Sequence, residues 1–374
     1  MHCTPPQGRI KACAEDFVVD EIPAYAPIGT GAHVFVRFTK TNLTTVDAMR
    51  MLARALSCDP REAGFAGMKD KHGVTTQTIS LQAPRGTDPL DIARRAPELS
   101  LDGIQVREAI PHGNKLKPGH LAGNRFAVVV RGIARDRIGE VTRELDRLAR
   151  EGVPNAFGSQ RFGAGGDNPA RALAWLRGHP AGAGVGARST AGPRDRRMAR
   201  LLWSSLQSAV FNALLDARVR DGTWNSAVEG DLLKLRTSGG LFVCTDVQTD
   251  RQRARVGEIS PTGPMIGARM RWPDGAPAEL EREIAAQILG PEFDMTKTRP
   301  FGEGSRRALR LWVEELRWEI FDDDPRNSAA CVRVYFVLPK GAYATTVLAA
   351  AVTLEETRVA GGARATDEEE EEAE

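Results

Sequence analysis

Few residues in this chain are arranged for cross-linking or for metal binding. Its five cysteines form no C-x-x-C pair, and its six histidines include no H-E-x-x-H spacing. Disulfide frameworks and zinc sites are built from cysteines and histidines in patterns that this chain does not show. The sequence therefore predicts reduced thiols, no disulfide framework and no metal.

Long apolar runs are also missing. A membrane-spanning helix needs about 18 or more apolar residues in a row, and no such run occurs. The first residues, MHCTPPQGRIKAC, lack the apolar core of a secretory signal. The hydrophobic share of 41% and the charged share of 27% are typical of globular proteins. These features predict a cytoplasmic protein with no membrane partner.

Motifs for nucleotide cofactors and for serine hydrolysis are absent. GAGGDN at 163–168 contains G-x-G but follows no apolar strand and lacks the third glycine of a dinucleotide site. The chain has no Walker A ending and no G-x-S-x-G elbow. Nucleotide-driven and serine-hydrolase chemistries are therefore disfavoured.

The charges are distributed unevenly along the chain. Seven of the 49 acidic residues lie in the last eight, DEEEEEAE, so the first 366 residues carry 51 basic against 42 acidic side chains. A basic body suits a polyanionic partner such as a nucleic acid. The acidic end predicts a disordered, solubilising tail over 361–374.

The N-terminal part combines strand and helix patterns. HVFVRFTK, from His33, alternates apolar and polar residues as a half-buried strand does. Thr44 and Thr45 offer an N-cap for a helix with an apolar stripe. VTTQTISLQ and the run over 124–132 are typical of strands, and a charged amphipathic helix is expected over 137–150.

The middle of the chain differs from both ends. Residues 181–197 are rich in glycine, small residues and arginine, which predicts a loop, and a helical pattern follows over 198–221. The earlier pattern returns with a helix from about Arg306, a strand over 332–339 and a helix near Thr345. One domain interrupted by another explains this order.

The segment GMKDKHGVTTQ, at 67–77, raises a question about Asp70. Asp70 to Gly73 fits a type I turn, with aspartate at the first position and glycine at the fourth. The same loop joins a helix to a strand, where reactive groups are often held. The residues alone leave a structural and a catalytic aspartate both open.

Five segments follow one another in a recognisable order: AEDFVVDEIP (14–23), FAGMKDKHGVTTQ (65–77), LAGNRFAVVVRG (121–132), GVPNAFGSQRFG (152–163) and FVLPKGAYATTVL (336–348). In order and spacing they resemble the TruD family of tRNA pseudouridine synthases, over about residues 9–352. The resemblance implies a cofactor-independent isomerase that extrudes a uridine of tRNA, typically uridine 13, and converts it to pseudouridine.

The resemblance also implies an α+β fold with two domains. A catalytic domain with a mixed, largely antiparallel sheet is expected over 1–155 and 305–360, and an inserted, family-specific α/β domain over 156–304. The implied partners are tRNA and other structured RNA. We expect a monomer.

Two residues are implied to carry the chemistry. Asp70 matches the catalytic aspartate of the family, and Lys11 matches its basic partner. Without the resemblance, Lys11 would be interpreted as a surface lysine. Attack of the carboxylate on the sugar and proton abstraction at C2′ would use the same residue, so the sequence leaves both open.

Three residues are implied to form the uracil pocket. Phe126 matches the aromatic residue that stacks on the target base, although periodicity alone predicts a core position. Asn124 points to the same side of its strand and would support the site. Phe336 is a second candidate for lining the pocket, but its alternation with Val332 and Val334 favours core packing.

Four further residues are candidates for RNA contacts or support. Lys69, Lys71 and Arg161 would bind phosphates, or are ordinary surface charges. Gln77 is expected close to the Asp70 loop.

Two rival functions are a non-catalytic RNA-binding protein with the same fold and a methyltransferase, for which we find no glycine-rich cofactor motif.

Overall fold

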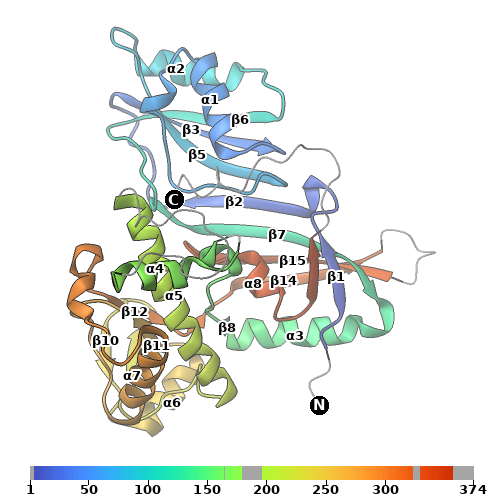
Figure 1. Ribbon diagram of the computed structural model, residues 1–374. Coiled ribbons are helices and arrows are strands. Elements are labelled where there is room, and N and C mark those ends of the chain that lie inside the picture. The colour runs from blue at the N-terminus through green and yellow to red at the C-terminus, as the bar shows by residue number, and fades with distance from the viewer. Residues whose placement is uncertain (1–3, 164, 179–195, 323–328, 357–374) are drawn as a thin grey trace. The chain divides into compact units, whose positions relative to one another are not determined.

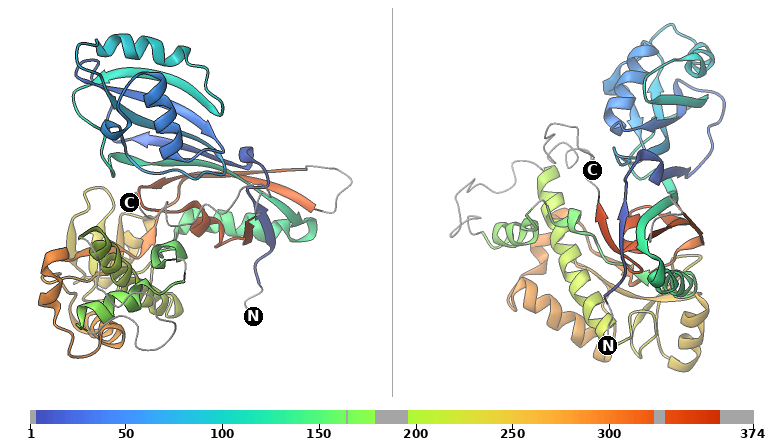
Figure 2. Two further views of the ribbon diagram at one scale, coloured as in Figure 1. Left: turned by 45° about the horizontal axis from the view of Figure 1, so that its top comes forward. Right: turned by 90° about the vertical axis from the view of Figure 1, so that its right-hand side faces the viewer.

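The structure is a computed structural model that describes residues 4–163, 165–178, 196–322 and 329–356 (Figure 1). The chain divides into a first unit, residues 1–150 with 313–374, and a second unit, residues 151–312 (Figure 2). The sequence predicts these limits at 155 and 305, and the catalytic role of the first unit stays a prediction. The acidic tail over 361–374 and nearly all of the loop expected over 181–197 lie outside the described residues.

One large sheet organises the first unit. Its main path runs β14 (Glu314–Phe321), β15 (Ala329–Pro339), β7 (Leu121–Ala134), β2 (Phe17–Pro23), β5 (Val74–Gln82), β3 (His33–Thr41) and β6 (Ile104–His112). β2 and β5 run parallel, and the other neighbours on this path run antiparallel. The predicted mixed, largely antiparallel sheet in an α+β fold is therefore confirmed.

Three short strands extend this sheet. β4 (Gly64–Phe65) pairs with β5, just before the segment that carries Asp70. β1 (Gln7–Ile10) pairs with β7 and runs parallel to β16 (Thr353–Glu356). Because β1 ends at Ile10, its pairing fixes the position from which Lys11 leaves the sheet.

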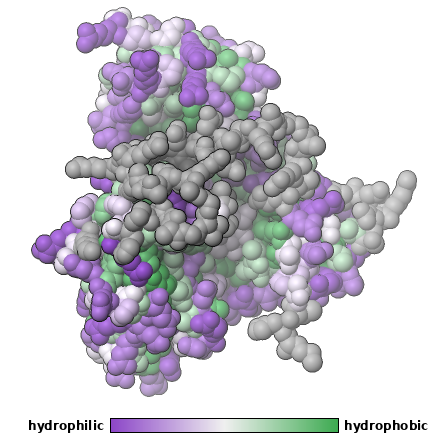
Figure 3. All heavy atoms as spheres, in the orientation of Figure 1, coloured by the Kyte–Doolittle hydropathy of each residue, from purple (hydrophilic) through white to green (hydrophobic). Residues whose placement is uncertain are grey.

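Helices α1 (Thr45–Ala55) and α2 (Pro89–Arg95) cover one face of β3, β5 and β6 (Figure 1). The Thr44 side chain caps α1 by accepting from the Asp47 amide, as the sequence predicts. The apolar stripe of α1 packs on alternate residues of β3, and the surface around these helices is mainly hydrophilic (Figure 3). The first unit also contains α3 (Ile138–Glu151), α8 (Ala344–Leu348) and the 3-10 helices Ala14–Asp16, Pro60–Glu62, Ala96–Glu98 and Arg135–Arg137.

The second unit has its own sheet and core. Its four-stranded sheet has the order β10 (Leu241–Val243), β9 (Leu232–Leu235), β11 (Ile259–Met265) and β12 (Ser305–Ala308), and β13 (Arg310–Leu311) pairs with β8 (Val153–Pro154). Its helices are α4 (Asn168–Leu176), α5 (Arg196–Arg220), α6 (Val247–Val256) and α7 (Gly275–Leu289), with 3-10 helices Ser159–Phe162 and Met295–Phe301. No helix in the described part of the chain is long and apolar enough to cross a membrane.

The helix expected from about Arg306 is wrong, because β12, β13 and β14 occupy this region. Leu309, Leu311 and Val313 are all buried, which is the period of two that a strand shows. Arg306 and Arg310 are buried as well. Partners far away in the chain bury them, which a local pattern does not report.

Arg306 forms a two-pronged ion pair with Glu281 of α7, at 2.6 and 2.7 Å, inside the second unit. Removing one partner from such a pair leaves a buried charge, at a cost of about 3–5 kcal/mol. We expect Arg306→Met to lower the free energy of unfolding of this unit by about that amount in urea titrations.

The double variant Arg306→Met/Glu281→Leu serves as the control. It replaces both charges by apolar groups and should recover most of the lost stability. If the double variant were as unstable as Arg306→Met, packing rather than the unpaired charge would explain the loss.

Candidate active site

Asp70 lies between β4 and β5 on a segment that does not form the expected hydrogen-bonded turn. Residues 71–73 form a bend. The Asp70 carbonyl, which would accept from the Gly73 amide in a type I turn, instead accepts from Lys40 Nζ at 2.7 Å. The conformation of this segment therefore depends on residues outside it.

Gly73 is required by a close approach to the chain that enters β2. A Cβ atom at this position would lie 2.5 Å from the Phe17 carbonyl oxygen. The Gly73 carbonyl in turn accepts from the Asn42 amide at 3.3 Å. The glycine thus lets the Asp70 segment pass between β2 and the end of β3, rather than supplying a turn conformation.

Lys11 and Asp70 meet, as predicted. Lys11 Nζ donates to Asp70 Oδ1 at 3.0 Å. The Asp70 side chain is 46% exposed, whereas that of Lys11 is only 14% exposed. Lys11 takes a left-handed backbone conformation with φ of 59°, directly after β1. The result is an accessible carboxylate with a largely shielded cation beside it.

An aromatic cluster adjoins this ion pair. Lys11 Nζ lies 4.6 Å from the centroid of the Phe17 ring, which meets Phe126 edge-on with 6.3 Å between ring centroids. Phe126 and Phe336 are directly paired on β7 and β15 and stack with centroids 5.2 Å apart. Phe126 is 6% exposed and Phe336 is fully buried, so both also belong to the core.

Asn124 shares its face of β7 with Phe126, and its register partners are Glu21 on β2 and Leu338 on β15. Its side-chain oxygen is buried and accepts no hydrogen bond within the described residues. A buried acceptor without a donor is destabilising and usually has a reason. This oxygen is therefore a candidate acceptor for a ligand.

The Lys69 side chain is buried, whereas a side chain that binds a phosphate must be accessible. Its side chain is 5% exposed, and its ammonium pairs with the buried Glu21 carboxylate at 2.7 Å. The Lys69 amide donates to Thr45 Oγ1 at 2.9 Å, and this hydroxyl is also bonded to the buried Gln77 amide. Lys69 and Gln77 hold the segment in place, and we no longer interpret them as direct RNA contacts.

Lys71 and Arg161 have different surroundings. Lys71 is exposed beside Asp70, as a phosphate contact requires. Arg161 belongs to the second unit, where its guanidinium donates to Ser204 Oγ and lies 5.8 Å from the centroid of the Phe157 ring. The structure therefore groups Lys71 with Asp70 and places Arg161 in a separate unit.

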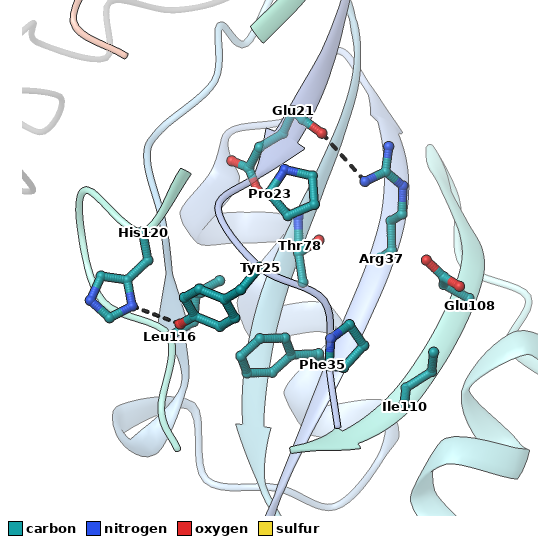
Figure 4. Close-up of a pocket in the computed structure, with 11 residues that line it drawn as sticks. Glu21, Pro23, Tyr25, Phe35, Arg37, Thr78, Glu108, Ile110, Leu116 and His120 are labelled. Carbon is teal, nitrogen blue, oxygen red and sulfur yellow. Dashed lines mark hydrogen bonds between the residues drawn. The ribbon is translucent and has the colours of Figure 1, made fainter. Parts of the chain in front are cut away.

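A small cavity of the first unit is lined in part by Glu21, the partner of Lys69, but by none of the predicted site residues (Figure 4). Tyr25 and Phe35 form part of its wall, and the Tyr25 hydroxyl is bonded to His120 Nδ1 at 2.7 Å. Its volume of about 50 Å³ holds a few water molecules rather than a nucleoside. We do not assign the substrate to it.

Three residues of the site were missed by sequence reasoning: Glu21, Lys40 and Thr45. The burial of Glu21 could have been predicted, because strand alternation places it on the same face of β2 as the buried Phe17 and Val19.

In the described part of the chain, no group of three or more His, Cys, Asp or Glu side chains is arranged to hold a metal ion.

Comparison with known proteins identifies the family. The family model for tRNA pseudouridine synthase D (TruD) matches residues 1–169 and 192–350. The chain belongs to the TruD family. Family membership confirms the resemblance seen in the five motifs, and it confirms the predicted enzyme class, an RNA pseudouridine synthase.

TruD relatives match the chain over most of its length. The tRNA pseudouridine synthase D of Anaeromyxobacter sp. (strain Fw109-5) is 42% identical over 344 residues, 91% of each chain. That of Pseudomonas putida (strain KT2440) is 36% identical over 345 residues, 92% of this chain and 91% of its own. A crystal structure of a Methanosarcina mazei protein named for TruD shares the fold, with a TM-score of 0.75 and 24% identity over 94% of this chain and 95% of that one.

The close approach at Gly73 gives a test of the site geometry. In Gly73→Ala the added methyl group would lie 2.5 Å from the Phe17 carbonyl, so the Asp70 segment must shift. A shift of about 1 Å near the reacting group can reduce activity about 100-fold. We expect a loss of roughly this size in kcat/KM for pseudouridine formation.

Gly67→Ala is the matched control on the same segment. A Cβ at Gly67 would meet its nearest neighbours at 3.7 and 3.8 Å, which are ordinary contacts. This variant should keep native kcat/KM. Equal losses in both variants would show that the segment is sensitive to any substitution, and not to the contact with Phe17.

Proposed function

We propose that this protein converts a uridine of tRNA, typically uridine 13 in this family, to pseudouridine, with Asp70 as the reacting carboxylate. The observation that carries the proposal is the accessible Asp70 carboxylate held at 3.0 Å from the shielded Lys11 ammonium. Family membership supplies the reaction class, and the relatives are named for tRNA. Such an enzyme would work in the cytoplasm on tRNA, without a cofactor.

The reaction sets clear demands on the site. The bond from uracil N1 to the ribose breaks, the freed base rotates, and a bond forms from the ribose to C5, which then loses its hydrogen. No oxidation or energy source is involved. The site must supply a carboxylate beside the sugar, a surface that retains the loose uracil, and shielding from water.

The ion pair between Lys11 and Asp70 can supply the carboxylate beside the sugar. When RNA covers Asp70, loss of water favours the protonated carboxyl group, and a nearby cation opposes this change. Lys11 is already at hydrogen-bond distance and largely buried, so it can keep the carboxylate charged in the covered site. A charged carboxylate serves both attack on the sugar and proton abstraction at C2′.

Phe126 and Asn124 would form the surface that retains the loose uracil. Phe126, which is 6% exposed, adjoins the ion pair through Phe17, and stacking on an aromatic ring contributes about 1–3 kcal/mol per base. The unpartnered Asn124 oxygen would accept a hydrogen bond from the uracil N3–H. The base must be extruded from the folded RNA to reach them, as in other enzymes that act on bases.

Basic side chains would position the RNA backbone. Lys71 is exposed next to Asp70 and suits a phosphate near the target nucleotide. Arg161 is proposed as a residue of the second unit that binds an RNA phosphate. Phe336, being fully buried, supports the ring of Phe126 from behind.

Tritium release from tRNA labelled at uridine C5 tests the reaction directly, because formation of the new bond at C5 expels this hydrogen. We expect release by the native protein and a loss of about 1,000-fold or more in Asp70→Asn, since a reacting carboxylate contributes about 10²–10⁴. The tRNA Kd of Asp70→Asn should stay within a few-fold of native.

Asp91→Asn is the control for removing an ion-paired surface carboxylate, because Asp91 pairs with Arg94 at 3.2 Å on α2. It should release tritium at the native rate. Native release in Asp70→Asn would return Asp70 to a structural role. Binding of tRNA by the native protein without any release would favour the RNA-binding rival.

Asn124→Leu separates a ligand contact from a fold contact. Leucine removes an acceptor for which the described part of the chain supplies no donor, so the melting temperature should stay equal or rise. The lost hydrogen bond to uracil should lower kcat/KM about tenfold.

Asn212→Leu provides the contrast. The Asn212 side chain is bonded at both ends to the backbone of Phe157, so its loss should lower stability. An Asn124→Leu protein that is destabilised but fully active would show that the Asn124 oxygen serves the fold.

A further inference from the structure

A fully buried lysine holds the main chain of the proposed catalytic residue. Lys40 is 0% exposed, and it lies near the end of β3. Its Nζ donates to the carbonyl oxygen of Asp70 at 2.7 Å and to that of Leu43 at 2.6 Å. The ammonium thus joins the Asp70 segment to the turn that leads into α1.

A charge is not needed to join two carbonyl groups. A neutral side chain could donate hydrogen bonds to backbone oxygens, whereas removing an ammonium from water costs several kcal/mol unless good partners compensate. Lys40 also stands in a core region, with the apolar Phe38 two residues earlier on the same face of β3. The buried ammonium brings both donors and a charge to the main chain of Asp70.

We infer that Lys40 is a positioning residue for pseudouridine formation: it fixes the backbone of Asp70 so that the carboxylate is presented beside Lys11, and its ammonium adds a positive charge next to that residue. This inference rests on the proposed role of Asp70. It assigns different tasks to two lysines, because Lys11 bonds the carboxylate and Lys40 bonds the main chain of the same residue.

The other charged groups near the segment do not supply this effect equally. Lys69 is compensated by Glu21 at 2.7 Å, and Lys71 and His72 are exposed, where water screens their charges. Lys11 is largely shielded and bonds the carboxylate itself, not the main chain of Asp70. Lys40, which water does not reach, keeps its place and its field when RNA replaces the solvent around Asp70.

Lys40→Met tests the inference, because methionine has a similar length but neither charge nor donor. We expect kcat for tritium release to fall about 100-fold, as for a misplaced reacting group, with KM and Kd for tRNA within about twofold of native. The acid limb of the kcat profile against pH should move to higher pH, because Asp70 loses a cation that favours its ionised form.

Two further variants serve as a conservative replacement and as a control. Lys40→Arg keeps charge and donors, and should leave the acid limb at its native pH and recover part of kcat. Lys115→Met is the matched control, since Lys115 Nζ also donates to a backbone carbonyl, that of Arg61 at 3.4 Å, but is not part of the Asp70 site. It should keep native kcat and a native acid limb.

Several outcomes would overturn the inference. Native kcat and a native acid limb in Lys40→Met would reduce Lys40 to a packing residue. If Lys40→Met does not fold, Lys40→Gln replaces it as a donor without charge, and a native acid limb there would be equally decisive. Failure of all Lys40 variants to fold would assign the lysine to the fold alone.

These results are distinguishable from failure of the proposed function. If the native protein releases no tritium, or if Asp70→Asn remains active, the proposed reaction or the role of Asp70 is wrong. If both behave as expected and only Lys40→Met is native, the inference about Lys40 alone is wrong.

Discussion

The buried ion pair between Lys69 and Glu21 fixes the segment on which the rest of the site depends. One oxygen of Glu21 binds the Lys69 ammonium at 2.7 Å, and the other accepts from the Thr78 amide at 3.1 Å. One carboxylate thereby joins β2, β5 and the Asp70 segment. Taking two charges out of water costs several kcal/mol each, and only good geometry offsets it. The segment is therefore held in one arrangement at Lys69, and Asp70 is the residue that follows Lys69.

The parallel pairing of β2 and β5 explains why distant residues meet at this point. Val18 pairs with Val74, so both strands begin at the same end of the sheet. The chain that enters β2 and the chain that enters β5 must then run side by side. This brings Lys11 against Asp70, which lies 59 residues later, and brings Phe17 against Gly73. The antiparallel neighbour β7 adds Phe126 and Asn124 from the other side.

Local patterns predicted much of the fold, and they failed where distant charges are buried. The alternation from His33 and the Thr44 cap gave β3 and α1 correctly, because both signals involve residues close in sequence. Lys69 was interpreted as a surface cation, and Arg306 as part of a helix, because their partners lie far away in the chain. A charged side chain looks exposed in a sequence unless its partner is also known.

The sequence by itself determined β3, β5, β7 and β15, the first helix, the family and the choice of Asp70 with Lys11, since these depend on short-range periodicity and on motifs in a fixed order. Only the tertiary structure decided how the two are held. It buried Lys69 on Glu21, replaced the expected turn bond at Asp70 by a bond from Lys40, and gave the Asn124 oxygen no donor among the residues it describes. The physical reason is that the burial of a polar group depends on which distant residues pack around it, and chain topology sets this packing.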